Sequence, residues 1–270
     1  MDDPKASLST LRNSIDDVDN RLLDLLNERA RLVIEVGRLK HEQSRDFHVP
    51  SRDREIYERL TASNTGPFPN ESLRTVFREI ISASLALEAP MKVAFLGPKA
   101  TFSHLAAMQQ FGLSAELVPQ KSIPAVFEDV EKGRALYGVV PVENSTEGVV
   151  SHTLDMFMES ELKISAEVLL EVSHFLLSRT GRIEDIKKVY SHPQPLAQCR
   201  HWLEDNLPHV PVVDVASTTM AAQIAGEDYS AAAIASEYAA SVYDLKIVRE
   251  RIEDQVNNFT RFLVVGKKIA

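Results

Sequence analysis

An unbroken helical repeat of apolar side chains over residues 8–39 constrains the fold more than any other feature of the sequence. Apolar residues recur at spacings of three and four, which is the spacing of one amphipathic helix. No Pro or Gly interrupts the repeat before Gly37. At about 1.5 Å per residue, this helix would be nearly 50 Å long. The repeat consists of Leu8, Leu11, Ile15, Val18, Leu22, Leu25, Leu26, Leu32, Val33 and Val36.

Two shorter helices are predicted in the rest of the first ninety residues. One follows Pro50, and the next begins after Asn70, which is a good N-cap residue. Three helices dominated by one so long do not close a compact core alone. We therefore expect a homodimer in which the long helix pairs with a copy from another chain.

The pattern changes after Pro90 to short apolar strands that alternate with helices. This alternation predicts a largely parallel sheet with helices on both faces. We expect two α/β lobes, with the last strand returning to the first lobe and a ligand cleft between the lobes. The predicted strands are 92–96, 115–118, 137–142, 164–177 in one or two pieces, 188–190, 210–215, 231–234 and 260–265, and the predicted helices are 102–110, 123–132, 196–206, 218–226 and 236–242.

Composition narrows the class of protein. The chain has 270 residues, 44% of them hydrophobic, and a net charge of −9, which argues against a general nucleic-acid surface. No secretion signal and no apolar run long enough to span a bilayer is evident, so we expect a cytosolic protein without membrane contact. The scattered histidines and the lack of Gly-rich phosphate loops predict no metal and no nucleotide or other cofactor. The single cysteine, Cys199, is interpreted as a small buried hydrophobe.

The segment Asn257-Asn258-Phe259-Thr260-Arg261-Phe262 places a hydroxyl and a guanidinium between amides and aromatic rings. Such a set can form an anion pocket with a hydroxyl proton available in it. A capped edge strand explains the segment equally well, so other segments have to decide.

Charged residues also lie along the helical half. Arg29 and Lys40 are eleven residues apart, so they share one helix face about 16 Å apart, and their long side chains can converge on one small anion. Arg12 lies about 25 Å from Arg29 along the axis, and can serve only a partner's site. Ser84 and Glu88 are an i, i+4 pair on the third helix. On pattern alone, surface salt bridges are the better explanation of these charges.

Five segments of this half together resemble the all-helical, intertwined-dimer chorismate mutases over residues 8–89, so we expect a mutase domain at 1–89. They are Leu11-Arg12 with Ile15-Asp16-x-x-Asp19, Leu25-Leu26-Asn27-Glu28-Arg29, Val36-Gly37-Arg38-Leu39-Lys40, Pro50-Ser51-Arg52-Asp53 and Phe77-Arg78-Glu79-Ile80-Ile81-Ser82-x-Ser84-x-x-Leu87-Glu88.

The resemblance implies that chorismate is the substrate and prephenate the product. Arg29 and the partner protomer's Arg12 would bind the two substrate carboxylates with help from Ser84. Lys40 and Glu88 would donate to the ether oxygen, and Arg52 and Asp53 would lie near the ring hydroxyl. Asp53 stands where the family usually has Glu, and Val49 replaces a polar residue.

Six ordered segments of the other half resemble prephenate dehydratase over residues 92–265, which implies a domain at 91–270 with two lobes like a type II periplasmic binding protein. They are Phe95-Leu96-Gly97-Pro98-x-x-Thr101-Phe102-Ser103-His104-x-Ala106-Ala107, Gly138-Val139-Val140-Pro141-Val142-Glu143-Asn144-Ser145-Thr146-Glu147-Gly148, Ser191-His192-Pro193-Gln194-Pro195-x-x-Gln198-Cys199, Ser217-Thr218-Thr219-x-Ala221-Ala222, Ala233-Ile234-Ala235-Ser236 and the segment from Asn257 to Phe262.

The dehydratase resemblance nominates Thr260 as general acid, with Arg261 holding a carboxylate of prephenate and Phe262 shaping the ring pocket. Asn144, Ser191, Gln198 and Thr218 would orient the substrate. The other candidate binding residues are Thr101, Ser103, Ser145, Thr146, Ser217, Thr219 and Asn258, which belong to the motif segments and follow predicted strands or open helices. Helix capping alone is the simpler explanation for Ser122 and Ser236, whereas capping and binding can coexist at the others.

The two resemblances imply a bifunctional enzyme of phenylalanine biosynthesis. A two-lobed ligand-binding or sensing module and an active mutase with a silent dehydratase are the alternatives. Many similar proteins continue into an ACT domain that binds phenylalanine, whereas this sequence ends at Ala270. Whether the sequence was cut there or the protein lacks that control is left open.

Overall fold

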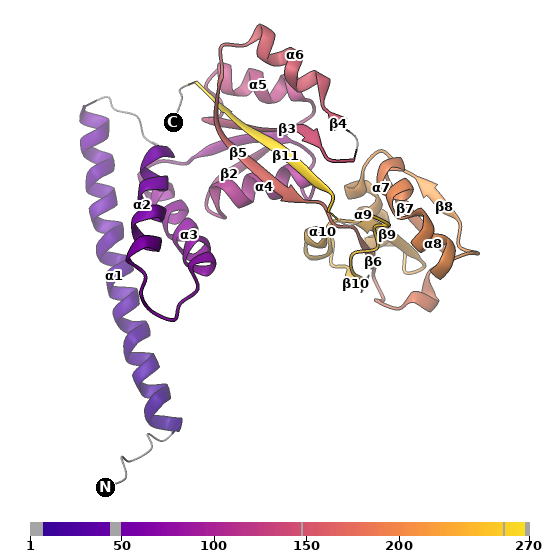
Figure 1. The fold of residues 1–270 in the computed structure, drawn as a ribbon, viewed down its shortest axis with the longest axis horizontal. Coiled ribbons are helices and arrows are strands. Elements are labelled where there is room, and N and C mark those ends of the chain that lie inside the picture. Colours follow the sequence, from indigo (N-terminus) through magenta and orange to yellow (C-terminus); the bar gives the residue numbers. More distant parts are fainter. Residues whose placement is uncertain (1–7, 44–49, 147, 256, 268–270) are drawn as a thin grey trace. The chain divides into compact units, whose positions relative to one another are not determined.

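The computed structural model describes residues 8–43, 50–146, 148–255 and 257–267. The chain divides into two compact units between Met91 and Lys92, and the short segment 112–115 belongs to the first. The first unit is all helical and the second is α/β, as Figure 1 shows. The expected order of an all-helical domain and an α/β domain is confirmed.

The helical unit contains the three predicted helices, α1 (Leu8–Glu42), α2 (Pro50–Ser63) and α3 (Asn70–Glu88). No residue of α1 is buried, and its apolar repeat lies open, with Leu11 51% and Ile15 59% exposed. The expectation that Asn70 caps α3 was wrong. Pro69 is the N-cap residue and makes no side-chain cap bond, because its ring has no polar atom. Asn70 is the first residue of the helix, and its Oδ1 accepts a hydrogen bond from Asn64 Nδ2 at 2.6 Å.

The first sheet of the α/β unit has the order β2-β1-β3-β11-β5, with β4 paired to β3. β1 runs parallel to β2 and β3, whereas β11 runs antiparallel to β3 and β5. The return of the last strand to this sheet is confirmed, and Figure 1 shows β11 lying along β5. The elements are β1 (Lys92–Leu96), α4 (Phe102–Phe111), β2 (Glu116–Gln120), α5 (Ile123–Glu131), β3 (Tyr137–Asn144), β4 (Gly148–Val149), α6 (Ser151–Glu159), β5 (Lys163–Glu171) and β11 (Phe259–Gly266).

The second sheet has the order β10-β6-β9-β7-β8, so the expected division into two lobes is confirmed. β7 is parallel to β8 and β9, whereas β6 is antiparallel to β9 and β10. The elements are β6 (Phe175–Ser178), η1 (Ile183–Asp185), β7 (Lys188–Ser191), α7 (Pro193–Gln198), α8 (Arg200–Asn206), β8 (Val212–Asp214), α9 (Thr218–Glu227), β9 (Ala231–Ala235), α10 (Glu237–Val242) and β10 (Lys246–Arg249).

The prediction of a largely parallel sheet was wrong, because both sheets are mixed. The chain leaves the first lobe through β5 and returns through β11, and the returning strand runs antiparallel to both of its neighbours, β3 and β5. The single predicted helix over 196–206 is two helices, α7 and α8, that meet at Cys199 with φ −112° and ψ 16°.

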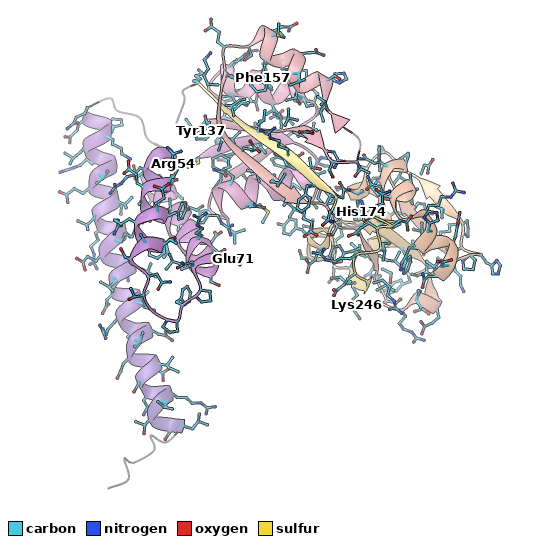
Figure 2. All side chains as sticks on the ribbon, viewed as in Figure 1. Arg54, Glu71, Tyr137, Phe157, His174 and Lys246 are labelled. Carbon is cyan, nitrogen blue, oxygen red and sulfur yellow. The ribbon has the colours of Figure 1, made fainter. Side chains whose placement is uncertain are left out.

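Each lobe packs its own apolar core. Phe127 and Val140 lie in the core of the first sheet, and Figure 2 shows Phe157 of α6, which meets Phe127 edge to face. Leu177 and Ile234 belong to the two clusters of the second sheet. Among the described residues, no helix combines the length and the apolar character needed to cross a membrane.

Candidate active sites

In the helical unit, α3 brings together the two cations that α1 spaces far apart. Arg29 Nη1 donates a hydrogen bond to Ser84 Oγ, which itself donates to the Ile80 carbonyl at 2.6 Å. Burial lowers the pKa of Arg29, and the negative charge of Asp53 partly offsets this effect. Ser84 is therefore fixed from its own helix and presents its oxygen to the arginine.

The second contact between these helices pairs Lys40 with Glu88. Lys40 Nζ lies 3.2 Å from Glu88 Oε2, and the Glu88 side chain is only 5% exposed. Gly37 permits this approach, because a Cβ there would lie 2.9 Å from Glu88 Cγ. Ser84 and Glu88 are one turn apart, about 6 Å, so the side chains of Arg29 and Lys40 lean toward one another from positions about 16 Å apart.

The other predicted residues of this unit lie away from these contacts or beside them. Arg12 is exposed near the start of α1, and the continuous helix keeps it apart from Arg29 of the same chain. Arg52 is exposed and pairs with Glu55 at 2.9 Å. Asp53 is close enough to act electrostatically on Arg29 and on Tyr57, and its charge adds to burial in raising the pKa of Tyr57 to about 12. Val49 lies outside the described residues.

The α/β unit contains a cavity of about 390 Å³ that draws residues from both lobes. This volume lies in the range of small-molecule sites. None of the described residues that line it is Arg or Lys. The lining consists of Leu96, Thr101, Phe102, Ser103, Pro141, Asn144, Val150, Val172, His174, His192, Gln194, Pro195, Gln198, Ala216, Ser217, Thr218, Asn258, Thr260 and Phe262.

Thr260 and Asn144 face each other across paired strands in this cavity. Their Cα atoms are partners in the β3–β11 register, and Asn144 Nδ2 donates to Thr260 Oγ1 at 2.8 Å. An amide nitrogen donates but does not accept, so Oγ1 is the acceptor and the threonine's own hydrogen points away from Asn144. Asn144 also donates to Asn258 Oδ1 at 2.9 Å, while its Oδ1 accepts from the Thr146 N–H at 3.0 Å.

The series of side-chain hydrogen bonds continues from Asn258 into the second lobe. Asn258 Nδ2 donates to Gln198 Oε1 at 3.3 Å, and His174 Nε2 lies 2.7 Å from the same oxygen. His174 was missed from the sequence, although a histidine between two apolar strands was a signal. Figure 2 shows it where the chain passes between the two sheets.

Three helices begin at the cavity, and two of them, α4 and α9, offer backbone N–H groups to a cavity lining that contains no Arg or Lys among the described residues. Thr101 precedes α4, and its hydroxyl oxygen accepts from the His104 N–H at 3.4 Å. Ser217 caps α9 through the Met220 N–H, with Thr218 next to it. His192, which the sequence analysis did not nominate, caps α7. Helix N-termini favour anions, so this arrangement suits a ligand with carboxylates.

The predicted role of Arg261 as the carboxylate holder requires correction. Successive side chains of a strand point to opposite faces, and Thr260 and Phe262 take the cavity face of β11. The exposed Arg261 side chain instead pairs with Glu167 at 2.6 Å and lies 3.9 Å from Glu143.

Ser191 also requires correction as a substrate-orienting residue. It is fully buried, and its hydroxyl donates to the Ile234 carbonyl at 2.7 Å. This bond ties β7 to β9 and leaves the side chain outside the cavity lining.

The remaining nominated residues support the cavity from outside or stand at its edge. Ser145 accepts from the Phe259 N–H at 2.9 Å, and Thr219 donates to the Lys99 carbonyl at 3.1 Å. Ser122 caps α5, as expected, whereas Ser236 donates to the Ala100 carbonyl at 3.1 Å and makes no cap bond. Ser103 lines the cavity, and Thr146 lines a neighbouring one that shares Gln198 and Asn258.

No group of three or more His, Cys, Asp or Glu side chains that could hold a metal ion occurs in the described part of the chain. The buried Cys199 thiol has a raised pKa, chiefly because of burial and also because of the nearby Glu253 and Asp254 charges. This thiol is thus a poor nucleophile.

Comparison with known proteins assigns each unit to a family. A chorismate mutase type II family model matches residues 11–89, and a prephenate dehydratase family model matches residues 93–270. The bifunctional chorismate mutase/prephenate dehydratase of Aquifex aeolicus is 52% identical over 265 residues, covering 97% of this chain and 73% of the relative. That of Stutzerimonas stutzeri is 44% identical, with the same coverage of 97% and 73%.

The solved structures agree for the α/β unit. The crystal structure of prephenate dehydratase from Arthrobacter aurescens in complex with L-Phe has a TM-score of 0.61 and is 35% identical. The match covers 67% of this chain and 61% of that one. Both family models match in order along the chain, and the Aquifex aeolicus relative is similar over 97% of this chain, so the chain belongs to the family of bifunctional chorismate mutase/prephenate dehydratases.

Proposed function

We propose that the helical unit rearranges chorismate to prephenate. This reaction is a concerted rearrangement and needs no nucleophile, so the protein has to hold a compact conformer and supply hydrogen bonds where the breaking C–O bond leaves negative charge. Support comes from the convergence of Arg29 with Ser84 and of Lys40 with Glu88 on one face between α1 and α3. Arg29 would bind a carboxylate, and Arg52 and Asp53 would lie near the ring hydroxyl. Lys40 would donate to the ether oxygen, as would Glu88 in its protonated form, since only a protonated carboxyl group can donate.

The mutase site is completed in this proposal by a second copy of the chain. The apolar repeat of α1 is exposed in one chain, which supports burial against another copy. Arg12 cannot reach the Arg29 of its own helix, which supports its donation to the partner's site as the second carboxylate ligand.

The α/β unit would convert prephenate to phenylpyruvate. Protonation of the ring hydroxyl lets it leave as water, the bond to the ring carboxylate breaks, and its electron pair completes the aromatic ring as carbon dioxide departs. The general acid is the main chemical need. Thr260 fits this role, since it lines the cavity together with Phe262 and Phe102, and the α4 and α9 N-termini would face the substrate carboxylates.

One observation carries the assignment of Thr260. The hydrogen bond from Asn144 to Thr260 Oγ1 turns the hydroxyl hydrogen away from Asn144 and stabilises the negative charge that develops on the oxygen as its proton leaves. Asn144 therefore assists Thr260 as the proposed acid.

Two variants of the whole chain test the assignment of the two reactions. We expect Lys40→Ala to lower chorismate turnover by at least about 100-fold and to leave turnover of added prephenate unchanged. Thr260→Ala should do the reverse, with a loss of about 100-fold or more in prephenate turnover. Loss of both activities in either variant, or a Thr260→Ala chain whose prephenate turnover is within about tenfold of wild type, would refute the assignment.

The cytosolic location stays a prediction that cell fractionation can test.

A further inference from the structure

His174 is a buried histidine in the dehydratase cavity that the proposed reaction does not use. The residue is 1% exposed, and its ring meets the Phe102 ring edge to face, with the ring centroids 5.9 Å apart. Its backbone N–H donates to Glu253 Oε2 at 2.8 Å, and its carbonyl accepts from the Ile252 N–H at 2.9 Å. The histidine is therefore held on both sides.

The contact with Gln198 determines which ring nitrogen carries the proton. Gln198 Oε1 is an acceptor only, so His174 Nε2, at 2.7 Å, is the donor. Nδ1 is buried and has no hydrogen-bond partner in the part of the chain that the structure describes. Burial lowers the pKa of His174, although Gln198 and Glu253 act in the opposite direction. The ring is thus the neutral tautomer with hydrogen on Nε2, and it has no proton to give to a leaving hydroxyl.

Two donors then occupy the carbonyl oxygen of Gln198, His174 Nε2 and Asn258 Nδ2. The Gln198 side chain lines the cavity, so the polar group left to face a ligand there is its NH₂. An amide turned the other way would present its oxygen to a carboxylate and would leave the buried His174 donor unpaired.

We propose that His174 is a positioning residue of the dehydratase site, which holds the Gln198 amide so that its NH₂ group, and not its carbonyl oxygen, faces a carboxylate of prephenate. This inference rests on the proposed dehydratase function. It concerns recognition of a dianion in a cavity whose described lining contains no Arg or Lys, where each correctly turned amide carries much of the discrimination.

A double-mutant cycle on the whole chain tests the proposal, with prephenate as substrate. We expect His174→Leu to raise the KM for prephenate about tenfold with less than about a threefold change in kcat, because the lost contact serves binding. His174→Gln keeps a donor where Nε2 lies, so it should return KM to within about threefold of wild type. In a Gln198→Leu background, His174→Leu should add nothing further to KM.

Each contrary result has a distinct meaning. Additive effects of His174→Leu and Gln198→Leu, or a His174→Gln chain as impaired as His174→Leu, would overturn the positioning role. So would a fall in kcat in both His174 variants, since that would make the ring a proton donor or a general core residue. A wild-type chain that turns over no prephenate would overturn the proposed function, and this inference with it.

Discussion

At the scale of single residues, the dehydratase cavity would bind prephenate, a dianion, with uncharged hydroxyl and amide groups. Asn144, Asn258 and Gln198 form one hydrogen-bonded chain that begins at Thr260 and ends at His174. Asn144 and Asn258 have no freedom to reverse, because the oxygen and the NH₂ of each are used in one sense, and the Gln198 oxygen is held by two donors. This series of hydrogen bonds therefore fixes the orientation of the Thr260 hydroxyl and of the amide donors near it.

Two neighbours of Thr260, Asn144 on the paired strand and Arg261 on the same strand, give a matched pair of variants. Asn144→Ala removes the hydrogen bond to Thr260 Oγ1, so we expect kcat for prephenate to fall at least about 100-fold. Arg261→Ala removes an exposed ion pair on the other face of β11 and should leave kcat within about threefold of wild type. Steady-state kinetics of both variants would contradict the assignment if Arg261→Ala were as impaired as Asn144→Ala.

Residue types could be predicted here more reliably than residue roles. The motif segments named Asn144, Gln198, Asn258 and Thr260, which the structure brings together. The roles of Arg261 and Ser191 were wrong for different reasons. Strand alternation was available from the sequence and excludes Arg261 from the face of Thr260. The bond from Ser191 to the Ile234 carbonyl depends on which strands pair, and one sequence does not show this.

At the scale of elements, segments with a strong apolar periodicity were predicted correctly, whereas helices without a recognisable N-cap residue were missed. The long helix and most strands were found, whereas β4 and β10 were missed. The helix α6 was also missed, because Val150, the residue before its start, provides no side-chain cap. The split between α7 and α8 was also missed. Asp254, over fifty residues further along the chain, accepts from the N–H groups of His201 and Trp202 and so caps α8. Contacts of this kind are tertiary and leave no local pattern.

The closeness of α1 and α3 leads to a prediction for Gly37. A Cβ at this position would lie 2.9 Å from Glu88 Cγ and 3.2 Å from Glu88 Cβ, so the helices must separate to accept it. We expect Gly37→Ala to lower chorismate turnover about tenfold even though Ala favours the helix by about 1 kcal/mol. Prephenate turnover should not change.

A second glycine provides the control for this variant. Gly66→Ala lies in the loop between α2 and α3, where the added Cβ meets only Asn64 Oδ1 at 3.8 Å. Its chorismate turnover should match wild type. Equal activity of the two alanine variants would show that the approach of α1 to α3 at Gly37 is not needed for the reaction.

At the scale of the whole molecule, two buried histidines couple the α/β unit to pH. Burial lowers the pKa of both His104 and His174, and the charge of Lys99 adds to the effect at His104. The unfolded chain then binds more protons than the folded one at mildly acid pH. Their contribution to stability is fully present above the unfolded pKa of about 6.5 and is lost as pH falls from there through the lowered folded pKa values.

We therefore expect the unfolding temperature of the α/β unit to drop as pH falls below about 6.5, well before most carboxylates are protonated. Calorimetry at a series of pH values checks this. His174→Gln removes one of the two groups and should make the dependence shallower. A wild-type unfolding temperature that stays constant between about pH 6.5 and 5 would contradict the account of these two histidines.

The proposed sharing of Arg12 between protomers makes a further prediction for the assembled protein. Arg12→Ala and Arg29→Ala chains should each lack chorismate turnover. Co-expression should restore about one quarter of the wild-type sites, because half of the randomly formed dimers are mixed and each holds one intact site. Sites built within a single chain would regain nothing on mixing.

The central claim is that one chain carries both reactions. The most direct test is to give the purified chain chorismate and to follow its loss and the appearance of phenylpyruvate, without the acid treatment that itself dehydrates prephenate. We expect chorismate to disappear and phenylpyruvate to accumulate with no added cofactor. Prephenate that accumulates and persists, or chorismate that is not consumed, would contradict the account.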